Sequence, residues 1–320
     1  MIDHGVHPPR TQTVEAVMRA ELAHGDAMAG TILPILRHLI SAEDNSVFSD
    51  EILARVRGML AALANGLLNA TFAVDGQAVH GGHPPKLVDA LTGAFMDHPA
   101  LLAHLHCTAL EWQLTERLQA RLALDPVVSP LVQALIASPD SATQGLGMTF
   151  LAAQARWCQA QRRMELAPSE LPGELFHAAL LALRAVCASD PELARRSGIA
   201  EVGLRERYDE AASRLGLAGR LVVSMGGGAQ AALSISHAGI ALFLTALAMG
   251  SGQERDPVVL STHESQLARF ALALRAAGQK ASLVEEQFLA LHPDVTMPVG
   301  FDRLGVDLAA SILASGRYTG

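Results

Sequence analysis

Apolar residues recur along most of the chain at spacings of three and four, a pattern typical of helices that bury one face. The longest uninterrupted example is residues 99–124, which contain no glycine and no proline after the first position. Its apolar residues fall on two nearly opposite sides, with Leu101, Leu105, Ala109 and Trp112 on one and Leu110, Leu114, Leu118 and Leu122 on the other. Because a surface helix keeps a single stripe, we expect this helix to be a central strut that different neighbours cover at its two ends.

Several helix starts are marked by a capping residue followed by proline. The cap accepts a hydrogen bond from the first turn, and proline lacks the N–H that this turn leaves unpaired. The pairs are His98-Pro99, Asp125-Pro126, Ser138-Pro139, Asp190-Pro191 and Asp256-Pro257. Together with the periodicity they predict helices over residues 13–28, 31–40, 50–70, 85–96, 99–124, 126–137, 139–164, 170–188, 191–196, 201–215, 238–249, 258–277, 281–291 and 302–314.

This pattern predicts an all-α fold, either an irregular multi-helix bundle or a stack of antiparallel helix pairs. The helix starts share no common period, so we expect no regular repeat. Residues 74–85 are rich in glycine and proline and mark a soft boundary. We expect an N-terminal helical segment over 1–75, a central helical domain over 84–197, and a C-terminal helical domain over 198–320 with buried uncharged helices.

Composition and charge limit the classes of function. Half of the 320 residues are apolar and 18% are charged, which indicates a folded core. The net charge of −8 disfavours nucleic-acid binding, because phosphates require a basic surface. The arginines between residues 184 and 220 alternate with acidic residues, as on a solvated face with weak ion pairs. We therefore expect no nucleic-acid partner.

Residues 221–253 carry no formal charge. Their longest apolar stretch, 238–249, is shorter than the roughly 20 residues that a bilayer requires, so we expect a buried helix and no membrane span. The first residues lack the apolar stretch of a signal peptide, and Cys107, Cys158 and Cys187 lie in apolar surroundings, as reduced thiols do. These features favour a cytoplasmic protein, and the strong bias of arginine over lysine is typical of a GC-rich bacterial genome.

The best metal candidate lies in the central helix, where His104, Cys107 and Glu111 share one face at spacings of three and four. Imidazole, thiolate and carboxylate are zinc and iron ligands, although a single helix seldom completes such a site. The alternative is that His104 and Glu111 face solvent or bond locally while Cys107 packs as a small apolar group. His80 and His83, with Asp75 nearby, form a second and less complete candidate.

A possible ligand site follows residues 221–225, where a strand-like segment precedes three glycines, Gly226, Gly227 and Gly228, and a helical stretch. Such a turn can bind phosphate through backbone N–H groups. The lysine and serine or threonine of a phosphate loop are absent, which favours a tight turn between packed helices instead. His237, Ser234 and Ser236 are the polar residues nearest to this turn that can line a pocket.

The end of the helix predicted over 139–164 is unusually polar around Trp157 and Cys158. Two interpretations remain open: a partner docks there, or the helix end faces water. The polar residues are Gln154, Arg156, Gln159, Gln161, Arg162 and Arg163.

With no nucleophile motif, the sequence favours a non-catalytic cytoplasmic helical scaffold or a regulatory protein that acts through protein–protein interaction. A mean hydropathy of +0.26 also predicts self-association, because excess apolar area is commonly buried between subunits. The alternative is a small-ligand- or metal-binding helical enzyme with a pocket between the central helix and residues 221–250. No cofactor is predicted, and the sequence names neither a partner nor a ligand.

Overall fold

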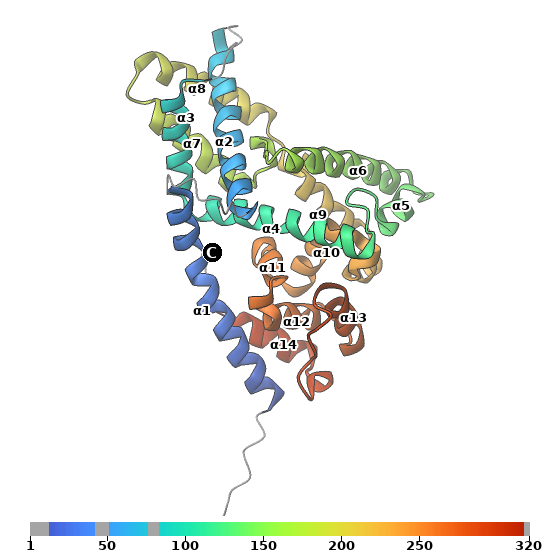
Figure 1. Ribbon diagram of the computed structural model, residues 1–320. Helices are drawn as coiled ribbons and strands as arrows, with labels where there is room; N and C mark the ends of the chain where they lie inside the picture. The colour runs from blue at the N-terminus through green and yellow to red at the C-terminus, as the bar shows by residue number, and fades with distance from the viewer. Residues whose placement is uncertain (1–12, 42–50, 76–82, 317–320) are drawn as a thin grey trace, which may run out of the picture.

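The computed structural model describes residues 13–41, 51–75 and 83–316, and this part of the chain contains helices and loops but no β-strand. The predicted all-α fold is confirmed, and the helices form an irregular bundle (Figure 1). In chain order they are α1 (Val14–Ser41), α2 (Glu51–Phe72), α3 (Pro85–Met96), α4 (Pro99–Leu122), α5 (Pro130–Ile136), α6 (Ser141–Arg162), α7 (Gly173–Cys187), α8 (Pro191–Arg207), α9 (Arg214–Ser224), α10 (Ile235–Ser251), α11 (Arg255–Ser261), α12 (Leu267–Ala276), α13 (Ala281–Leu291) and α14 (Val306–Ala314).

Helix α4 runs across the middle of the molecule, with α2, α3, α7 and α8 on one side and α11, α12 and α14 on the other (Figure 1). Its two halves belong to two hydrophobic cores. The α2 core includes Val56, Leu63, Leu67, Leu101, Leu105, Ala109 and Leu180. The α10 core includes Leu114, Leu118, Leu221, Phe243, Leu247 and Phe270. The expectation of a central strut with different neighbours at its two ends is therefore confirmed.

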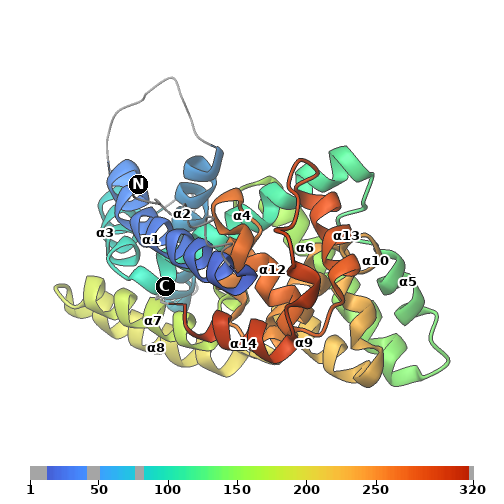
Figure 2. The same ribbon diagram turned by 90° about the horizontal axis from the view of Figure 1, so that it is seen from below.

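Helix α1 joins the same two cores from the outside. Met18 and Leu22 pack into the α10 core, and Leu36 and Ile40 pack into the α2 core. In the view from below, α1 lies along the outer face of the molecule, beside α2 and α12 (Figure 2). The first of the three segments expected from the sequence thus packs directly against the other two.

The break expected between the helices over 13–28 and 31–40 is wrong, since α1 is continuous from Val14 to Ser41 through Gly30 and Pro34. A proline inside a helix removes one hydrogen bond to the carbonyl four residues earlier, here that of Gly30. Pro34 and Gly30 are both exposed, and buried residues anchor α1 before and after them. Tertiary packing therefore offsets the missing bond.

The capping residue followed by proline marks a helix start at two of the five expected positions. His98 and Asp190 cap α4 and α8 through their side chains, as expected. The starts expected at Pro126 and Pro139 are wrong, because Ser129 caps α5 and Asp140 caps α6 a few residues later.

The fifth pair fails because Asp256 lies inside the first turn of α11. The single helix expected over 258–277 is also wrong, since α11 ends at Ser261 and α12 begins at Leu267. The hydroxyls of Ser261 and Thr262 donate to the carbonyls of Val258 and Val259, which favours termination of the helix there. Conversely, α8 runs without a break from Pro191 to Arg207, across the gap expected between 196 and 201. The helix expected over 201–215 is wrong in its second part, because α8 ends at Arg207 and α9 begins at Arg214.

The uncharged stretch 221–253 is built from the end of α9, the 3₁₀ helix η4 (Gly226–Leu233) and the buried α10. The strand-like reading of 221–225 is wrong, because these residues finish α9. Within the described residues, no single helix is long and apolar enough to cross a membrane. Only η4 and α10 together, bent by 112°, meet that length and composition.

Candidate functional site

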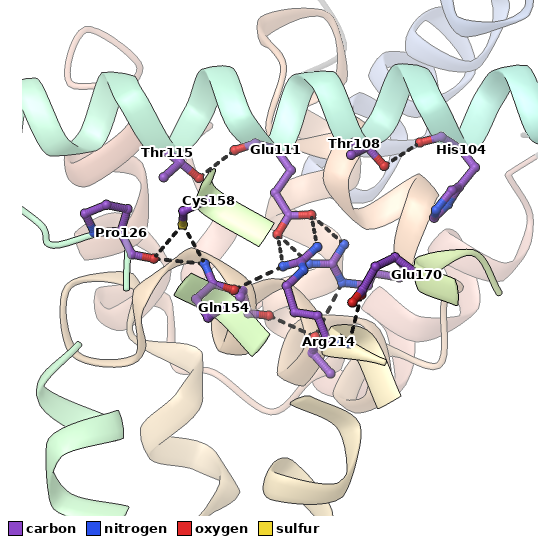
Figure 3. Close-up of polar contacts among 12 residues, drawn as sticks. His104, Thr108, Glu111, Thr115, Pro126, Gln154, Cys158, Glu170 and Arg214 are labelled. Atoms are coloured by element: carbon purple, nitrogen blue, oxygen red, sulfur yellow. Dashed lines mark hydrogen bonds and ion pairs between the residues drawn. The ribbon is translucent and has the colours of Figure 1, made fainter. Parts of the chain in front are cut away.

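The most strongly built polar site of the described chain lies beneath the middle of α4 (Figure 3). Glu111, only 1% exposed, is held by two guanidinium groups. Its carboxylate oxygens lie 2.8 and 3.1 Å from the Nη1 and Nη2 atoms of Arg214, and 2.8 Å from each of the two Nη atoms of Arg255. Both arginines thus bind Glu111 in the bidentate geometry that gives the strongest charge-assisted hydrogen bonds.

Arg214 is placed by the start of α9. The Ser213 hydroxyl caps this helix by accepting from the Gly216 N–H at 3.1 Å, and Glu170 accepts from the Arg214 backbone N–H at 3.0 Å. Gly216 is required here, because a Cβ atom would lie 2.1 Å from the Glu210 carbonyl oxygen. The guanidinium then lies 4.0 Å from the centre of the Trp157 ring, a cation–π contact that helps to replace its lost hydration.

Arg255 comes from the opposite side, as the first residue of α11. Gly252, with φ of 69°, ends α10 in the left-handed conformation and turns the chain back toward α4. The Arg255 Nε atom lies 3.4 Å from the Thr245 hydroxyl oxygen of α10. Glu111 therefore joins α4 to the starts of both α9 and α11.

Burial on its own would raise the pKa of Glu111, but Arg214 and Arg255 together hold it far below its ordinary value. In the same way, burial would lower the pKa of Arg255, and the carboxylate of Glu111 reverses that effect and raises it. Glu111 and Arg255 are therefore both charged at neutral pH. The second positive charge is balanced by the neighbouring Asp256.

The residues predicted to bind a metal instead contact other residues of the protein. His104 is buried, and its Nδ1 atom lies 2.9 Å from Asp256 Oδ2, while the Cys107 thiol lies 3.5 Å from the Asp256 carbonyl oxygen. Burial and the charge of Asp256 raise the Cys107 pKa well above its ordinary value. Across residues 13–41, 51–75 and 83–316, no three His, Cys, Asp or Glu side chains are grouped so as to hold a metal ion.

The expectation that His104 and Glu111 face solvent or bond only locally is wrong, because both are buried and bind residues from α11. Cys107 does pack as expected, inside the α10 core. The second candidate lies largely outside the described residues, which include neither His80 nor the side chain of Asp75.

The predicted ligand residues around the glycines lie apart from this site. Gly226, Gly227 and Gly228 are exposed at the start of η4, and Gly226 has φ of 50°, which a tight turn requires. His237 is half-buried in the first turns of α10. The turn joins two packed helices, α9 and α10, as the alternative interpretation expects.

The sequence did not identify Arg214, Arg255 or Asp256. Arg214 was expected on a solvated face, which is wrong because it is only 3% exposed. The expectation does fit its neighbours Arg195 and Arg205, which are 49% and 42% exposed and form ion pairs with Glu192 and Glu201. The available signal was the charged run 254–256, which ends an uncharged stretch of the sequence two positions after Gly252.

A pocket of about 500 Å³ opens beside this network, at the N-terminal half of α4. The side chain of Asp256, 27% exposed, forms part of its wall, so the buried network reaches the surface through this residue. The remaining lining comes from three places: the link between α10 and α11, α12 with α14, and the first turn of α4. These residues include Ala100, Ala103, Gln253, Glu254, Arg269, Ala310 and Leu313.

Replacing Glu111 by Gln keeps its shape but removes its charge, which leaves two buried guanidinium groups undercompensated. We predict a loss of about 3–5 kcal/mol in the free energy of unfolding at neutral pH. The carboxylate contributes fully above its ordinary pKa of 4.5, and this contribution is lost as the pH falls from there toward its lower folded-state value. The difference between wild type and Glu111→Gln therefore stays constant down to about pH 5 and shrinks at lower pH.

Urea unfolding followed by far-ultraviolet circular dichroism measures this difference at each pH. Glu116→Gln on the same helix is the control, because that side chain is 47% exposed and its nearest Arg55 nitrogen is 3.9 Å away. We expect it to change stability by less than about 1 kcal/mol. A Glu111→Gln protein as stable as wild type contradicts the prediction.

No family model matches the sequence, and neither a curated protein nor a solved structure shows significant similarity to it.

Proposed function

We propose that the protein is a non-catalytic binding protein for a small, positively charged organic molecule, and that its site is the pocket beside Asp256. The observation that supports this proposal most is that the pocket and the buried ion network share a residue. Asp256 belongs to both, so a carboxylate is held in place by buried partners while part of it faces the pocket.

Two of the three charged side chains in the pocket lining, those of Asp256 and Glu254, are carboxylates. Burial alone would raise the pKa of Asp256, but His104 and Arg255 lower it, so this carboxylate is ionised at neutral pH. Glu254 adds a second, exposed carboxylate. The Oε1 atom of Gln253 is buried and accepts no hydrogen bond from the described chain. Arg269, the cation of the lining, is ion-paired with Asp26 of α1. Acceptors in this excess suit a ligand that donates hydrogen bonds and carries positive charge.

The size of the pocket and its small side chains define the rest of the ligand. A volume of about 500 Å³ lies within the range of small-molecule sites. Ala100, Ala103, Ala310 and Ala314 leave this space open, and Leu313 provides an apolar contact. A short alkyl amine or guanidine with a compact apolar part fits these walls. The pocket lies at the end of α10, outside the 221–250 segment that the sequence favoured.

Two features support a binding role over catalysis. The imidazole of His104 is buried against Asp256 and does not line the pocket, and the raised pKa of the Cys107 thiol keeps that group protonated. The three cysteines are free and buried, which fits the proposed cytoplasmic location.

Isothermal titration calorimetry tests the proposal with putrescine and agmatine as cationic probes and butyrate as an anionic control. We expect saturable binding of at least one cationic probe and none of butyrate. Asp256→Asn weakens that binding by about tenfold or more, because it removes the charge that faces the ligand. Ala310→Leu, which fills the pocket without touching the network, weakens it as well.

Asp302→Asn, a change in an exposed residue outside the pocket lining, is the matched control and leaves the affinity unchanged. Since Ala310→Leu leaves the ion pairs intact, it tests the pocket even if Asp256→Asn impairs folding. Equal affinity in wild type and Ala310→Leu, or absence of binding by both cations, contradicts the proposed function.

Self-association is a second candidate role, supported by the outer face of α1. Met28, Ile35 and Leu39 are 46%, 55% and 44% exposed, and Ile32 is half-buried beside them. These positions are symmetric about the midpoint between residues 33 and 34. An antiparallel second copy therefore places Met28 against Leu39 and Ile32 against Ile35, which is the self-complementary contact of a two-fold dimer.

Light scattering at micromolar concentration tests this role. We expect twice the monomer mass for wild type and the monomer mass for Ile35→Glu, because a buried charge at the centre of the contact is costly. Val223→Glu, at a residue of α9 that is 65% exposed, is the control and keeps the dimer. A monomeric wild type removes this candidate.

A further inference from the structure

A second hollow of about 770 Å³ lies on another part of the molecule, between α2 and α6. We call it the α2–α6 groove. One face of α2 forms one wall, with Asn65, Gly66 and Asn69. One face of α6 forms the other wall, with Arg156 and Gln159, and Arg163 with residues 165–168, which follow α6, closes the end. This is the polar helix end for which the sequence left open either a docked partner or plain solvation.

Close packing fixes the two walls relative to each other. A Cβ atom on Gly58 would lie 2.7 Å from the Met164 Cβ atom, and one on Gly66 would lie 3.1 Å from the Pro168 ring, so these glycines let the chain after α6 contact α2. The buried Gln161 side chain donates to the Glu165 carbonyl at 2.9 Å, and Arg55 of α2 donates to the Gln161 carbonyl. The groove is therefore part of the rigid fold.

Its charge is positive. The Nε atom of Arg163 donates to Glu165 Oε2 at 2.8 Å, so these two charges offset each other. Arg156 is exposed and makes no ion pair or hydrogen bond within the described chain. One guanidinium in the groove is thus uncompensated, in a protein whose net charge is −8.

The asparagines add oriented polar groups. His83, stacked on Phe72 with ring centres 5.2 Å apart, places its Nε2 atom 2.7 Å from Asn69 Oδ1. With the imidazole neutral and its Nε2–H donating to that oxygen, the Asn69 Nδ2 group remains as a donor. Asn65 Nδ2 donates to the Ala61 carbonyl, which leaves Asn65 Oδ1 as an acceptor. The groove thus offers a cation, an amide donor and an amide acceptor.

We propose that the α2–α6 groove is a binding site for a small hydroxylated anion, a carboxylate or a phosphate, which Arg156 holds by its charge. The Asn69 Nδ2 group donates to the anionic oxygens, and Asn65 Oδ1 accepts from a ligand hydroxyl. Guanidinium groups match carboxylate and phosphate geometry through paired N–H donors, which is why Arg156 is the central residue. This site is separate from the pocket beside Asp256 and has the opposite charge.

Isothermal titration calorimetry tests the site with malate as the hydroxylated carboxylate and inorganic phosphate as the phosphate. We expect saturable binding of at least one probe, weakened by added salt because the contact is ionic. Arg156→Ala lowers the affinity by about tenfold or more, in line with a charge-assisted contact. Arg162→Ala is the matched control, because Arg162 is an exposed neighbour on α6 that does not line the groove, and it leaves the affinity unchanged.

Binding of malate alone assigns the site to carboxylates, and binding of phosphate alone assigns it to phosphates. Both outcomes support the proposal when Arg156→Ala reduces the affinity and Arg162→Ala does not. Failure of both probes to bind, or an equal effect of the two arginine substitutions, overturns it. Arg156 is exposed, so the variant is expected to fold, and its unfolding temperature verifies this.

Discussion

The paired contact of Glu111 with Arg214 and Arg255 is the constraint on which the arrangement of helices depends. Burying a charged side chain costs several kcal/mol in desolvation, and this cost is offset only when the side chain is ion-paired and nearly all of its hydrogen bonds are made. Here both carboxylate oxygens bind two guanidiniums, and one of these guanidiniums lies over Trp157. The middle of α4 must therefore meet the starts of α9 and α11 in one register, since a displaced partner would leave a charge unpaired.

Apolar packing acts on a larger scale but with less directional control. The two cores fix α4 and α1 as the helices that span the molecule, because each of these helices contributes buried residues to both. Hydrophobic burial is roughly proportional to area and is not directional. The ion pairs of Glu111 are directional, so they fix the orientation of the helices that contribute them. The same contacts hold Asp256 at the wall of the pocket, which connects the fold to the proposed ligand site.

The periodicity of the sequence was sufficient to predict the helical fold and the two-sided burial of α4. The ends of the helices were harder to predict, because neighbouring residues compete to cap the same helix. Ser129 caps α5 where Asp125 was expected to, and Asp125 instead accepts from the backbone of Val127 and Val128. Continuity through Pro34 depends on packing at both ends of α1, which no local pattern contains.

The sequence identified the residues that α4 contributes to the candidate site, but not their partners from α9 and α11. His104, Cys107 and Glu111 were recognised as one polar face of α4, because their spacing is local. Their partners lie more than a hundred positions away, and charge alone does not distinguish a buried arginine from an exposed one. Arg214 and Arg205 belong to the same charged stretch, yet only Arg214 meets a carboxylate in the interior. The choice of ion pair over metal ligation was therefore decided by long-range contacts.

A double-mutant cycle between Glu111 and Arg214 tests the central claim most directly. Glu111→Met, Arg214→Met and the double variant are unfolded in urea at neutral pH, and the coupling energy is taken from the three changes in free energy. The account predicts strong non-additivity, with a coupling of about 2–3 kcal/mol, so that the double variant loses less stability than the sum of the two single losses. Additive changes, with a coupling near zero, would contradict the claim that this buried pair fixes α4 against α9.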